Sequence, residues 1–316
     1  MSLSLSLSLS LSLRMFRSVS RSAMRIPMFV GLVAVTEAFI APKSGFTTNH
    51  VATSPLRATN AKVAHEEGQA AARMPGATYT IADQPARFAR GKEEGNERML
   101  NIDKFYNPDY FKGKRVLVTG GNRGLGRAIS DALVDAGAET IITCRSLSDD
   151  VMNAGFAQVV SGIELTSTDS VNKLATEIEK PIDILINNAG YFYEPLETIE
   201  TMNFDEELKM IDICAVAPLR VSAALYNGGL LKEGSKIAMI TSQGGSVDWR
   251  FTQNPEGHDF GHHMSKAAAN MGGVILAQEL RSKGITVINL HPGFNKTGMT
   301  KKYEHIWEIE GAVDCA

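Results

Sequence analysis

From Lys114 onward, short apolar runs alternate with longer segments in which apolar residues recur every three or four positions. Short apolar runs bounded by polar residues are typical of buried strands, and the three-to-four spacing is typical of helices with one buried face. Strands that alternate with such helices favour a parallel sheet with helices packed on both faces. The pattern therefore predicts an α/β fold over the second two thirds of the chain.

Six strands and four helices are expected. The strands are 115–119, 140–144, 157–165, 183–188, 236–241 and 286–290, and the helices are about 124–136, 168–179, 204–226 and 262–283. Crossovers between parallel strands are right-handed, so the first strand is expected in the middle of the sheet. This is a Rossmann-type, doubly wound parallel sheet flanked by helices, which we expect to form a single domain over residues 113–316.

Residues 65–112 are polar and interrupted by glycines, so we expect a linker and an N-terminal arm rather than a second core. Residues 1–64 have the pattern of a targeting presequence. A serine–leucine repeat precedes four arginines and the apolar run 26–35, which is typical of a signal peptide and short for a membrane span. An uncleaved N-terminal anchor is the alternative.

The segment after that apolar run contains basic and hydroxyl residues but no acidic residue from Ala38 to Ala64, as in transit peptides. The stretch AFIAP also resembles the junction of two-part presequences in algae with complex plastids. This resemblance implies import into a plastid, with cleavage near Phe39. The secretory pathway is the alternative destination.

The charge of the chain, a formal net value of -3 without a long basic run, gives no reason to expect nucleic acid as a partner. A small-molecule substrate is the better expectation. The three cysteines show no CxxC spacing, which argues against a zinc site and a disulfide framework. His258, His262 and His263 are close in sequence, but no HExxH string accompanies them, so we expect no metal.

The stretch VTGGNRGLG lies where the first strand passes into the first helix. Gly120, Gly124 and Gly126 let the backbone approach a pyrophosphate closely, and a helix N-terminus offers free N–H groups to its charge. The strand-turn-helix context strengthens the prediction of a dinucleotide site over that of a tight turn without ligand. Asn122 and Leu125 of the same loop complete the expected cofactor contacts.

Two arginines bear on the choice between the nicotinamide cofactors. Arg145 follows the second strand, where an acidic residue would bind a free ribose hydroxyl and an arginine accommodates a 2'-phosphate. Arg123 lies within the glycine loop. Two cations near one phosphate favour NADP(H) over NAD(H), although each arginine alone could be a solvated surface charge.

These motifs, together with NNAG (187–190), MITS ending in Ser242, MSKAAANM and HPGFNKTGM, strongly resemble the short-chain dehydrogenase/reductases, and most closely their carbonyl-reductase-like branch. The resemblance covers about Lys114 to Met299. It implies a role for each matching residue: Asn188 supports the cofactor, Leu165 lies by its adenine, Thr297 meets the nicotinamide amide, Ser242 polarises the substrate oxygen, and Lys266 binds the nicotinamide ribose and lowers the pKa of a neighbouring acid.

Two positions depart from the family pattern. The family expects Tyr-x-x-x-Lys, and the residue four positions before Lys266 is His262. The family also expects an asparagine four residues before the proline of CAVAP, and Cys214 occupies that place. Both the proton donor and the water relay to the lysine are therefore altered.

His262 is expected on the same helical face as Lys266, because residues four apart share a face. An imidazole donates a proton well only when charged, and its ordinary pKa of about 6.5 leaves little of that form at pH 8. Neutral imidazole is a competent base for taking a proton from an alcohol. We therefore expect His262 to act as base, or as a shuttle through His263, in alcohol oxidation.

The main alternative is a cofactor-binding relative that has lost catalysis and acts as a sensor or assembly factor, with His262 only lining the site. A light-dependent reductase of a tetrapyrrole precursor is a weaker alternative, because it too expects the tyrosine. The substrate is expected between Ser242, the loop carrying Tyr191 and Tyr193, and the segment after Pro292. The family usually adds a seventh strand, and Ala316 is only 17 positions after Met299, so we expect a truncated or exposed sheet edge.

Overall fold

The computed structural model describes residues 91–101, 104–247, 250, 257–306 and 313–314. The expected presequence and most of the expected arm lie outside these residues. The end of the arm packs on the domain, because Phe111 of the short helix η2 (Pro108–Phe111) is fully buried in the core. Within the part described, no helix is long and apolar enough to cross a membrane.

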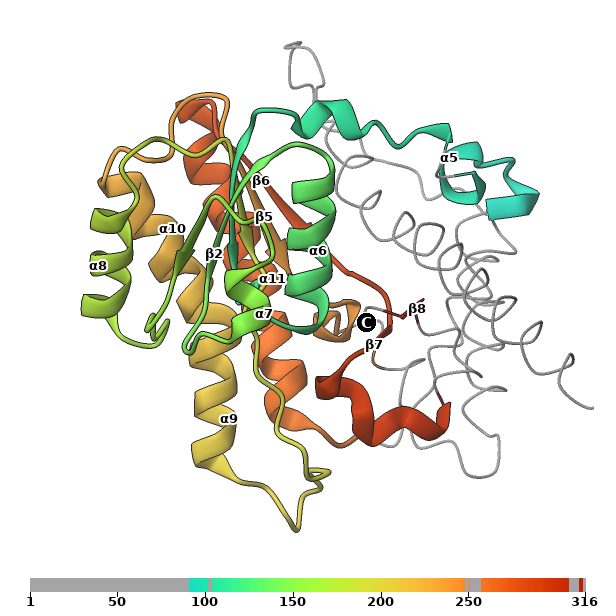
Figure 1. Ribbon diagram of the computed structural model, residues 1–316. Helices are drawn as coiled ribbons and strands as arrows, with labels where there is room; N and C mark the ends of the chain where they lie inside the picture. Colours follow the sequence, from blue (N-terminus) through green and yellow to red (C-terminus); the bar gives the residue numbers. More distant parts are fainter. Residues whose placement is uncertain (1–90, 102–103, 248–249, 251–256, 307–312, 315–316) are drawn as a thin grey trace, which may run out of the picture.

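The sheet contains six parallel strands in the order β3-β2-β1-β4-β5-β6, which confirms the expected doubly wound topology with the first strand inside (Figure 1). The strands are β1 (Arg115–Thr119), β2 (Glu139–Thr143), β3 (Gln158–Val160), β4 (Ile184–Asn187), β5 (Lys236–Ile240) and β6 (Thr286–Leu290). The chain turns in opposite directions on either side of the β1–β4 pair. In this topology, ligands bind at the carboxyl ends of the strands that flank such a point.

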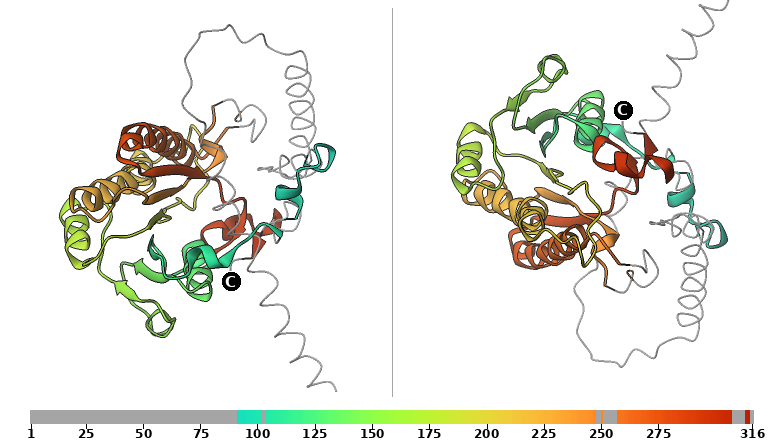
Figure 2. Two further views of the ribbon diagram at one scale, coloured as in Figure 1. Left: turned by 90° about the horizontal axis from the view of Figure 1, so that it is seen from above. Right: turned by 90° about the horizontal axis from the view of Figure 1, so that it is seen from below.

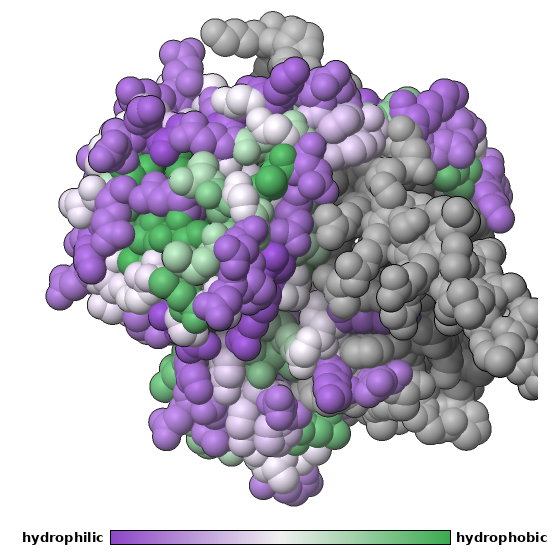
Figure 3. Space-filling view, viewed as in Figure 1, coloured by the Kyte–Doolittle hydropathy of each residue, from purple (hydrophilic) through white to green (hydrophobic). Residues whose placement is uncertain are grey.

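Helices lie on both faces of the sheet. They are α6 (Gly124–Asp135), α7 (Asp149–Met152), α8 (Thr168–Glu177), α9 (Phe204–Ile211), α10 (Ala217–Asn227) and α11 (Phe260–Leu280), with a short α5 (Glu97–Leu100) before the sheet. Figure 2 shows α8, α10 and α11 in a row along one face, with α6 on the other. On the side seen in Figure 3, hydrophilic residues cover α6 and hydrophobic residues gather between α6 and α8.

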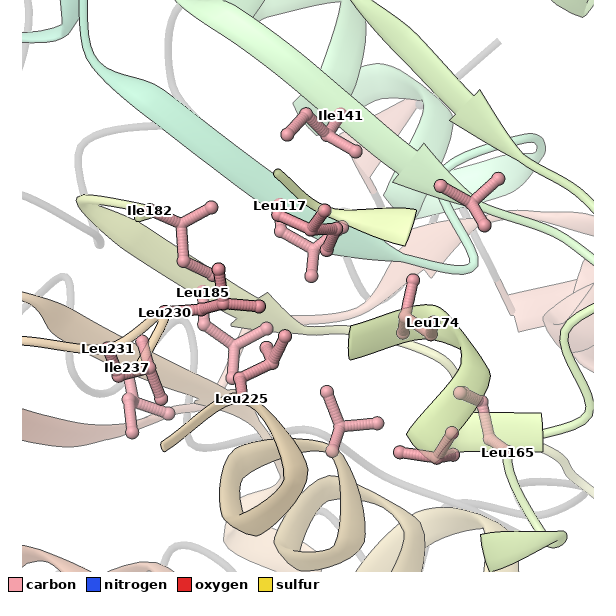
Figure 4. Packing of buried hydrophobic residues seen from close by; sticks show 14 of the residues in the cluster. Leu117, Ile141, Leu165, Leu174, Ile182, Leu185, Leu225, Leu230, Leu231 and Ile237 are labelled. Atoms are coloured by element: carbon pink, nitrogen blue, oxygen red, sulfur yellow. The ribbon is translucent and has the colours of Figure 1, made fainter. Parts of the chain in front are cut away.

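Alternation along β1 divides the core in two. Leu117 points toward the face covered by α8 and α10, where it joins Leu174 and Leu225 (Figure 4). Val116 and Val118 point toward the α6 face. All three β1 side chains have no exposed surface. Burial of a large aliphatic side chain contributes about 2 kcal/mol, so the two layers fix the position of β1 and of the loop that follows it.

The structure differs from the expected elements in several places, and the short helix α7 is one that was not expected. The third strand is confined to Gln158–Val160, and the rest of the expected run 157–165 is irregular. A π-helical turn, η3 (Asp212–Val216), separates α9 from α10 in the expected long helix. Pro218 has no N–H with which to continue a regular ladder, which accounts for the irregular turn before it. A small pair, β7 (Asn295–Lys296) and β8 (Val313–Asp314), was not expected.

Candidate functional site

The glycine loop leaves β1 and enters α6 as the sequence predicts. Gly120 has φ +64 and Gly124 has φ +53, which are left-handed conformations that favour glycine. A side chain on Gly126 would overlap the Gly120 carbonyl and the Asn188 amide. Arg123 stands at the N-cap of α6, without a side-chain bond to the helix. Arginine has only donors and cannot cap the first N–H groups of α6, which suits a phosphate site at this helix start.

Asn188 holds the loop after β4 against the glycine loop. Its Nδ2 donates to the Thr119 carbonyl at 3.0 Å and to the Gly120 carbonyl at 3.3 Å. The buried Thr119 hydroxyl accepts in return from the backbone N–H groups of Asn188 and Ala189. These bonds cross the β1–β4 pair at the carboxyl ends of the strands. Asn188 thus lies directly after β4, as the sequence predicts, and its hydrogen bonds hold the glycine loop in position.

The segment after β6 returns to the same place. A Cβ added to Gly124 would lie 3.6 Å from Thr297, so Thr297 packs beside the glycine loop. Its N–H donates to the Thr300 hydroxyl within the short helix η7 (Gly298–Ile306). Met299 approaches the NNAG loop, with its Cε 3.9 Å from a Cβ added to Gly190. The structure thereby brings together three of the motifs predicted to form the cofactor site.

Arg123 and Arg145 are both exposed near the start of α6 and the end of β2. Among the described residues, neither makes an ion pair with a carboxylate. The remaining loop residues, Asn122 and Leu125, are half-buried. Both guanidinium groups are therefore available to an anion from solvent.

Leu165 belongs to the core cluster beneath α8, and little of its side chain is exposed (Figure 4). Its carbonyl accepts a hydrogen bond of 2.6 Å from Arg220, which also pairs with Asp212. The segment before α8 is thereby tied to the long helix. A contact between Leu165 and an adenine stays a prediction.

Ser242 begins the short helix η4 (Gln243–Gly245) after β5. Its Oγ accepts the Gly244 N–H at 3.0 Å, which leaves the hydroxyl proton available to a substrate oxygen. His263 secures the same turn from α11, because its Nδ1 lies 3.0 Å from the Gly244 carbonyl. Nδ1 must carry a proton to donate to a carbonyl, and this defines the tautomer.

Burial, and after it the charge of Arg250, lowers the pKa of His263 to about 4. The imidazole is therefore neutral near pH 7, and its Nδ1 proton is held by Gly244. This argues against the relay through His263 that the sequence suggested. The residue instead stabilises the turn that carries Ser242.

Asn270 lies one helical turn after Lys266 and connects α11 to the same region. Its Nδ2 donates to the Ser242 carbonyl at 3.1 Å, and its Oδ1 accepts from the Thr241 hydroxyl at 2.8 Å. Gly245 lies directly against the Lys266 backbone, where a Cβ would not fit. The structure thus places the half-buried Lys266 beside the Ser242 turn, as the motifs predict.

His262 faces the loop that follows NNAG. Its ring is nearly perpendicular to that of Phe192, with 4.6 Å between the centroids, and lies 5.2 Å from the His263 ring. The interplanar angle of 83° is an edge-to-face arrangement, which aromatic pairs favour. The histidine in the place of the family's tyrosine is therefore ordered by packing at the expected end of the sheet.

Cys214 lies in the π turn and is almost fully buried. Its Sγ accepts from the Tyr191 N–H at 3.4 Å and donates to the Tyr191 carbonyl at 3.3 Å. The thiol therefore fastens the long helix to the loop after NNAG. π turns of this kind occur frequently at functional sites.

Sequence reasoning missed two polar residues that hold these parts together, Asn270 and Glu197, and gave His263 a different role. Asn270 could have been found, because it lies four residues after Lys266 on the same helical face. Glu197 gave no signal, since a lone acidic residue in a loop is ordinary. Among the described residues, no group of three or more histidine, cysteine or acidic side chains is arranged to hold a metal ion.

The comparisons with known proteins agree with this geometry. The family model for short chain dehydrogenase matches residues 114–306. The 1-hydroxy-2-glutathionyl-2-methyl-3-butene dehydrogenase of a Rhodococcus species is 33% identical over 191 residues, which is 60% of this chain and 80% of that protein.

Two solved structures share the fold. A short chain dehydrogenase from Burkholderia cenocepacia in complex with NADP is 25% identical with a TM-score of 0.55, covering 65% of this chain and 86% of that one. The NADPH-bound carbonyl reductase from chicken fatty liver is 25% identical with a TM-score of 0.50, covering 60% and 79%.

Proposed function

Because the chain belongs to the short-chain dehydrogenase family, we propose that it is an NADP(H)-dependent oxidoreductase that interconverts an alcohol and a carbonyl compound. The observation that carries the proposal is the meeting of the glycine loop, Asn188 and Thr297 at the β1–β4 switch point, with Ser242 and Lys266 beside it. Fold alone would not fix a reaction, whereas this set of side chains suits one.

The residues present fit the cofactor. The glycine loop provides backbone N–H groups at the start of α6, and its close contact with Asn188 leaves no room for a Cβ on Gly126. Arg123 and Arg145 supply two exposed cations for a 2'-phosphate, and the comparison structures of carbonyl reductase and of the Burkholderia dehydrogenase carry NADPH and NADP. Asn122, Leu125, Leu165 and Thr297 are the further proposed contacts. When bound, NADP(H) supplies or accepts the hydride.

Proton transfer falls to His262 in this proposal. In the oxidative direction, the neutral imidazole would take the proton from the substrate hydroxyl oxygen while the carbon that bears this oxygen gives up its hydride to bound NADP+, so that a carbonyl and an imidazolium result. Ser242 donates its hydroxyl hydrogen bond to the substrate oxygen, and Lys266 would bind the nicotinamide ribose and lower the pKa of His262. Reduction requires the charged imidazole and is therefore expected to be slower at alkaline pH.

Support for a carbonyl-reductase-like branch comes from the glycine loop, Arg145 and the similarity to the chicken reductase. The substrate would lie between Ser242, the loop carrying Tyr191 and Tyr193, and the segment after Pro292. A carbonyl or secondary alcohol is the class that this set of groups suits, since the Ser242 hydroxyl can donate to one substrate oxygen.

The deciding experiment measures binding and turnover together. The purified full-length protein would be titrated with NADPH and NADP+, then assayed on panels of aldehydes, quinones and secondary alcohols, with His262→Ala and His262→Tyr in parallel. We expect NADP+-dependent oxidation that His262→Ala reduces about 100-fold, as is typical for loss of a general base. Equal rates in all three proteins would remove His262 from the mechanism.

The second candidate function is a cofactor-binding protein without catalysis. It is favoured by two observations: His262 replaces the usual acid, and the Cys214 thiol is occupied by the Tyr191 backbone. Tight NADPH binding without hydride transfer to any acceptor would support it over the oxidoreductase.

We further propose that the protein forms a homo-oligomer through an apolar stripe on α9 and α11. The stripe consists of Phe204, Leu208, Met271, Val274 and Ile275. Each of these side chains is about half exposed or more, and large apolar side chains on exposed helix faces are typical of an interface.

The presequence supports a proposal about destination. We propose import into a plastid, on the basis of the signal-like run and the acid-free segment that follows it. Fusion of residues 1–64 to a fluorescent protein in a diatom would test this, and secretion of the fusion would favour the alternative.

A further inference from the structure

The helix that carries His262 does not cap its own start. Asp259, at the N-cap of α11, makes no side-chain bond to the helix, and its carboxylate lies 3.0 Å from the His258 ring instead. His258 and Asp259 both have positive φ, of 63 and 52, which is uncommon for residues other than glycine. A start of this kind persists only when surrounding contacts hold it.

Those contacts come from Glu197, in the loop between β4 and α9. Its carbonyl accepts the Asp259 N–H at 2.9 Å, and its Oε2 accepts the Gly261 N–H at 3.1 Å. Glu197 is 1% exposed. One residue therefore bonds two backbone groups of the α11 start, with a carboxylate at the positive end of the helix.

Gly261 allows this approach. A Cβ at Gly261 would overlap Met210 of α9 and lie 3.0 Å from the Glu207 backbone, so only glycine lets α11 sit this close to α9. Glu207 is also buried, and burial, followed by the charge of Glu197, raises its pKa. Of the two buried carboxyl groups, Glu197 is the one that bonds the helix start.

The same loop reaches His262 a second time. Phe192, five residues before Glu197, packs against the His262 ring, so the loop contacts both the backbone preceding His262 and its side chain. Figure 1 shows this loop running down beside the start of α11 before it enters α9.

We infer that Glu197 is the positioning residue for His262. By bonding the Asp259 and Gly261 amides, it holds the loop between β4 and α9 and the first turn of α11 as one unit. The role rests on the proposed function, in which His262 moves the proton. Glu197 itself does not touch the reacting atoms.

The test uses the full-length protein with Glu197→Ala, Glu197→Gln and, as a control in the same loop, Glu200→Ala. Glu200 is exposed and bonds Thr198, not α11. Hydrogen exchange of the peptide covering 258–264, the dissociation constant for NADPH, and kcat would be measured for each variant.

We expect Glu197→Ala to accelerate exchange at the start of α11 at least about tenfold, as loss of a hydrogen bond to a charged group allows, and to lower kcat by a similar factor. NADPH binding should change less than about twofold, because the glycine loop is not involved. Glu197→Gln retains an acceptor and should restore most of the protection. Wild-type exchange in a folded Glu197→Ala protein would overturn the inference, as would exchange that accelerates without any loss of kcat in an active enzyme.

A second measurement uses the wild-type protein, so it depends neither on whether a variant folds nor on whether the protein is an active enzyme. The Gly261 amide, followed by NMR, should be protected at least about tenfold relative to an unbonded glycine amide. Absence of that protection overturns the inference. Protection with no NADPH binding and no turnover would instead refute the proposed function while leaving the anchoring by Glu197 in place.

Discussion

His262 is held edge-on by Phe192, and the two rings come from α11 and from the loop after β4. The acid-base group of the proposed reaction is thus oriented by a residue of the loop expected to cover the substrate. Removal of this ring should loosen His262 without touching the cofactor site.

Phe192→Ala is therefore expected to lower kcat by up to about tenfold, since an aromatic pair contributes about 0.5 to 1.5 kcal/mol. Phe192→Tyr, which keeps the ring, should stay within about threefold of wild type. Steady-state kinetics with a saturating secondary alcohol would measure both. Equal losses in the two variants would show that the ring contact does not govern His262.

The preference for NADPH over NADH should depend on the charge of the residue that follows β2. Arg145→Asp removes a cation and adds a carboxylate suited to a ribose hydroxyl, so the dissociation constant for NADPH should rise about 100-fold while that for NADH falls. Calorimetry with both coenzymes is the measurement. Arg281→Asp makes the same charge change at the far end of α11 and should leave the ratio unchanged.

His263 should make stability depend on pH. Its folded pKa of about 4 is below the ordinary value of 6.5, so the neutral form stabilises the fold. That stability is complete above pH 6.5 and is lost as the pH falls from about 6.5 to 4, by about 3 kcal/mol in all.

His263→Asn keeps a donor for Gly244 and cannot titrate, so its urea midpoint should change less between pH 7 and pH 4.5 than that of the wild type. Other buried acids contribute to both proteins alike and cancel in the comparison. A wild-type-like acid response in the variant would contradict the assignment.

The glycine loop should not tolerate a methyl group at its third glycine. In Gly126→Ala, the Cβ would overlap the Gly120 carbonyl and the Asn188 amide, so we expect a loss of about 1 to 3 kcal/mol and of measurable NADPH binding. Gly298→Ala has open space around the added atom and negative φ, and serves as the control. Thermal unfolding with and without NADPH measures both effects.

The apolar stripe should determine the oligomeric state. Leu208→Glu and Met271→Glu place charges on α9 and α11 where side chains are 66% and 62% exposed. Sedimentation should show a lower mass for each than for wild type, since burying an unpaired charge in an interface is costly. Ile199→Glu, in the loop before α9, should sediment as wild type does.

Local sequence patterns predict much of this fold. The strands 115–119 and 286–290 match the structure residue for residue, because each is a short apolar run with a clear end. The position of the glycine loop between β1 and α6 could also be predicted, because the spacing of its glycines follows from backbone geometry. The third strand was predicted too long because Ile163 and Leu165 are apolar, but these two residues belong to the core beneath α8 and do not pair with β2.

The tertiary bonds that shape the site could not be seen in the same way. Nothing local indicates that Glu197 reaches Gly261, or that His263 rather than solvent takes the Gly244 carbonyl. Such contacts join residues 64 and 19 positions apart, and no local period specifies their pairing. The π turn before Pro218 could be predicted only in part. The proline indicates an interruption of the helix, but no sequence pattern indicates the hydrogen bonds that Cys214 makes to Tyr191.

That π turn has a bearing on any attempt to improve the protein. A π turn accommodates one residue more than an α turn, and the surplus rotates everything downstream, so that α9 and α10 present different phases to the sheet. Deleting a residue between Asp212 and Val216 would give a smoother and intrinsically more favourable helix. It would also rotate Arg220 away from the Leu165 carbonyl and Cys214 away from the Tyr191 backbone. A more regular helix at this point would therefore lose two contacts that shape the site.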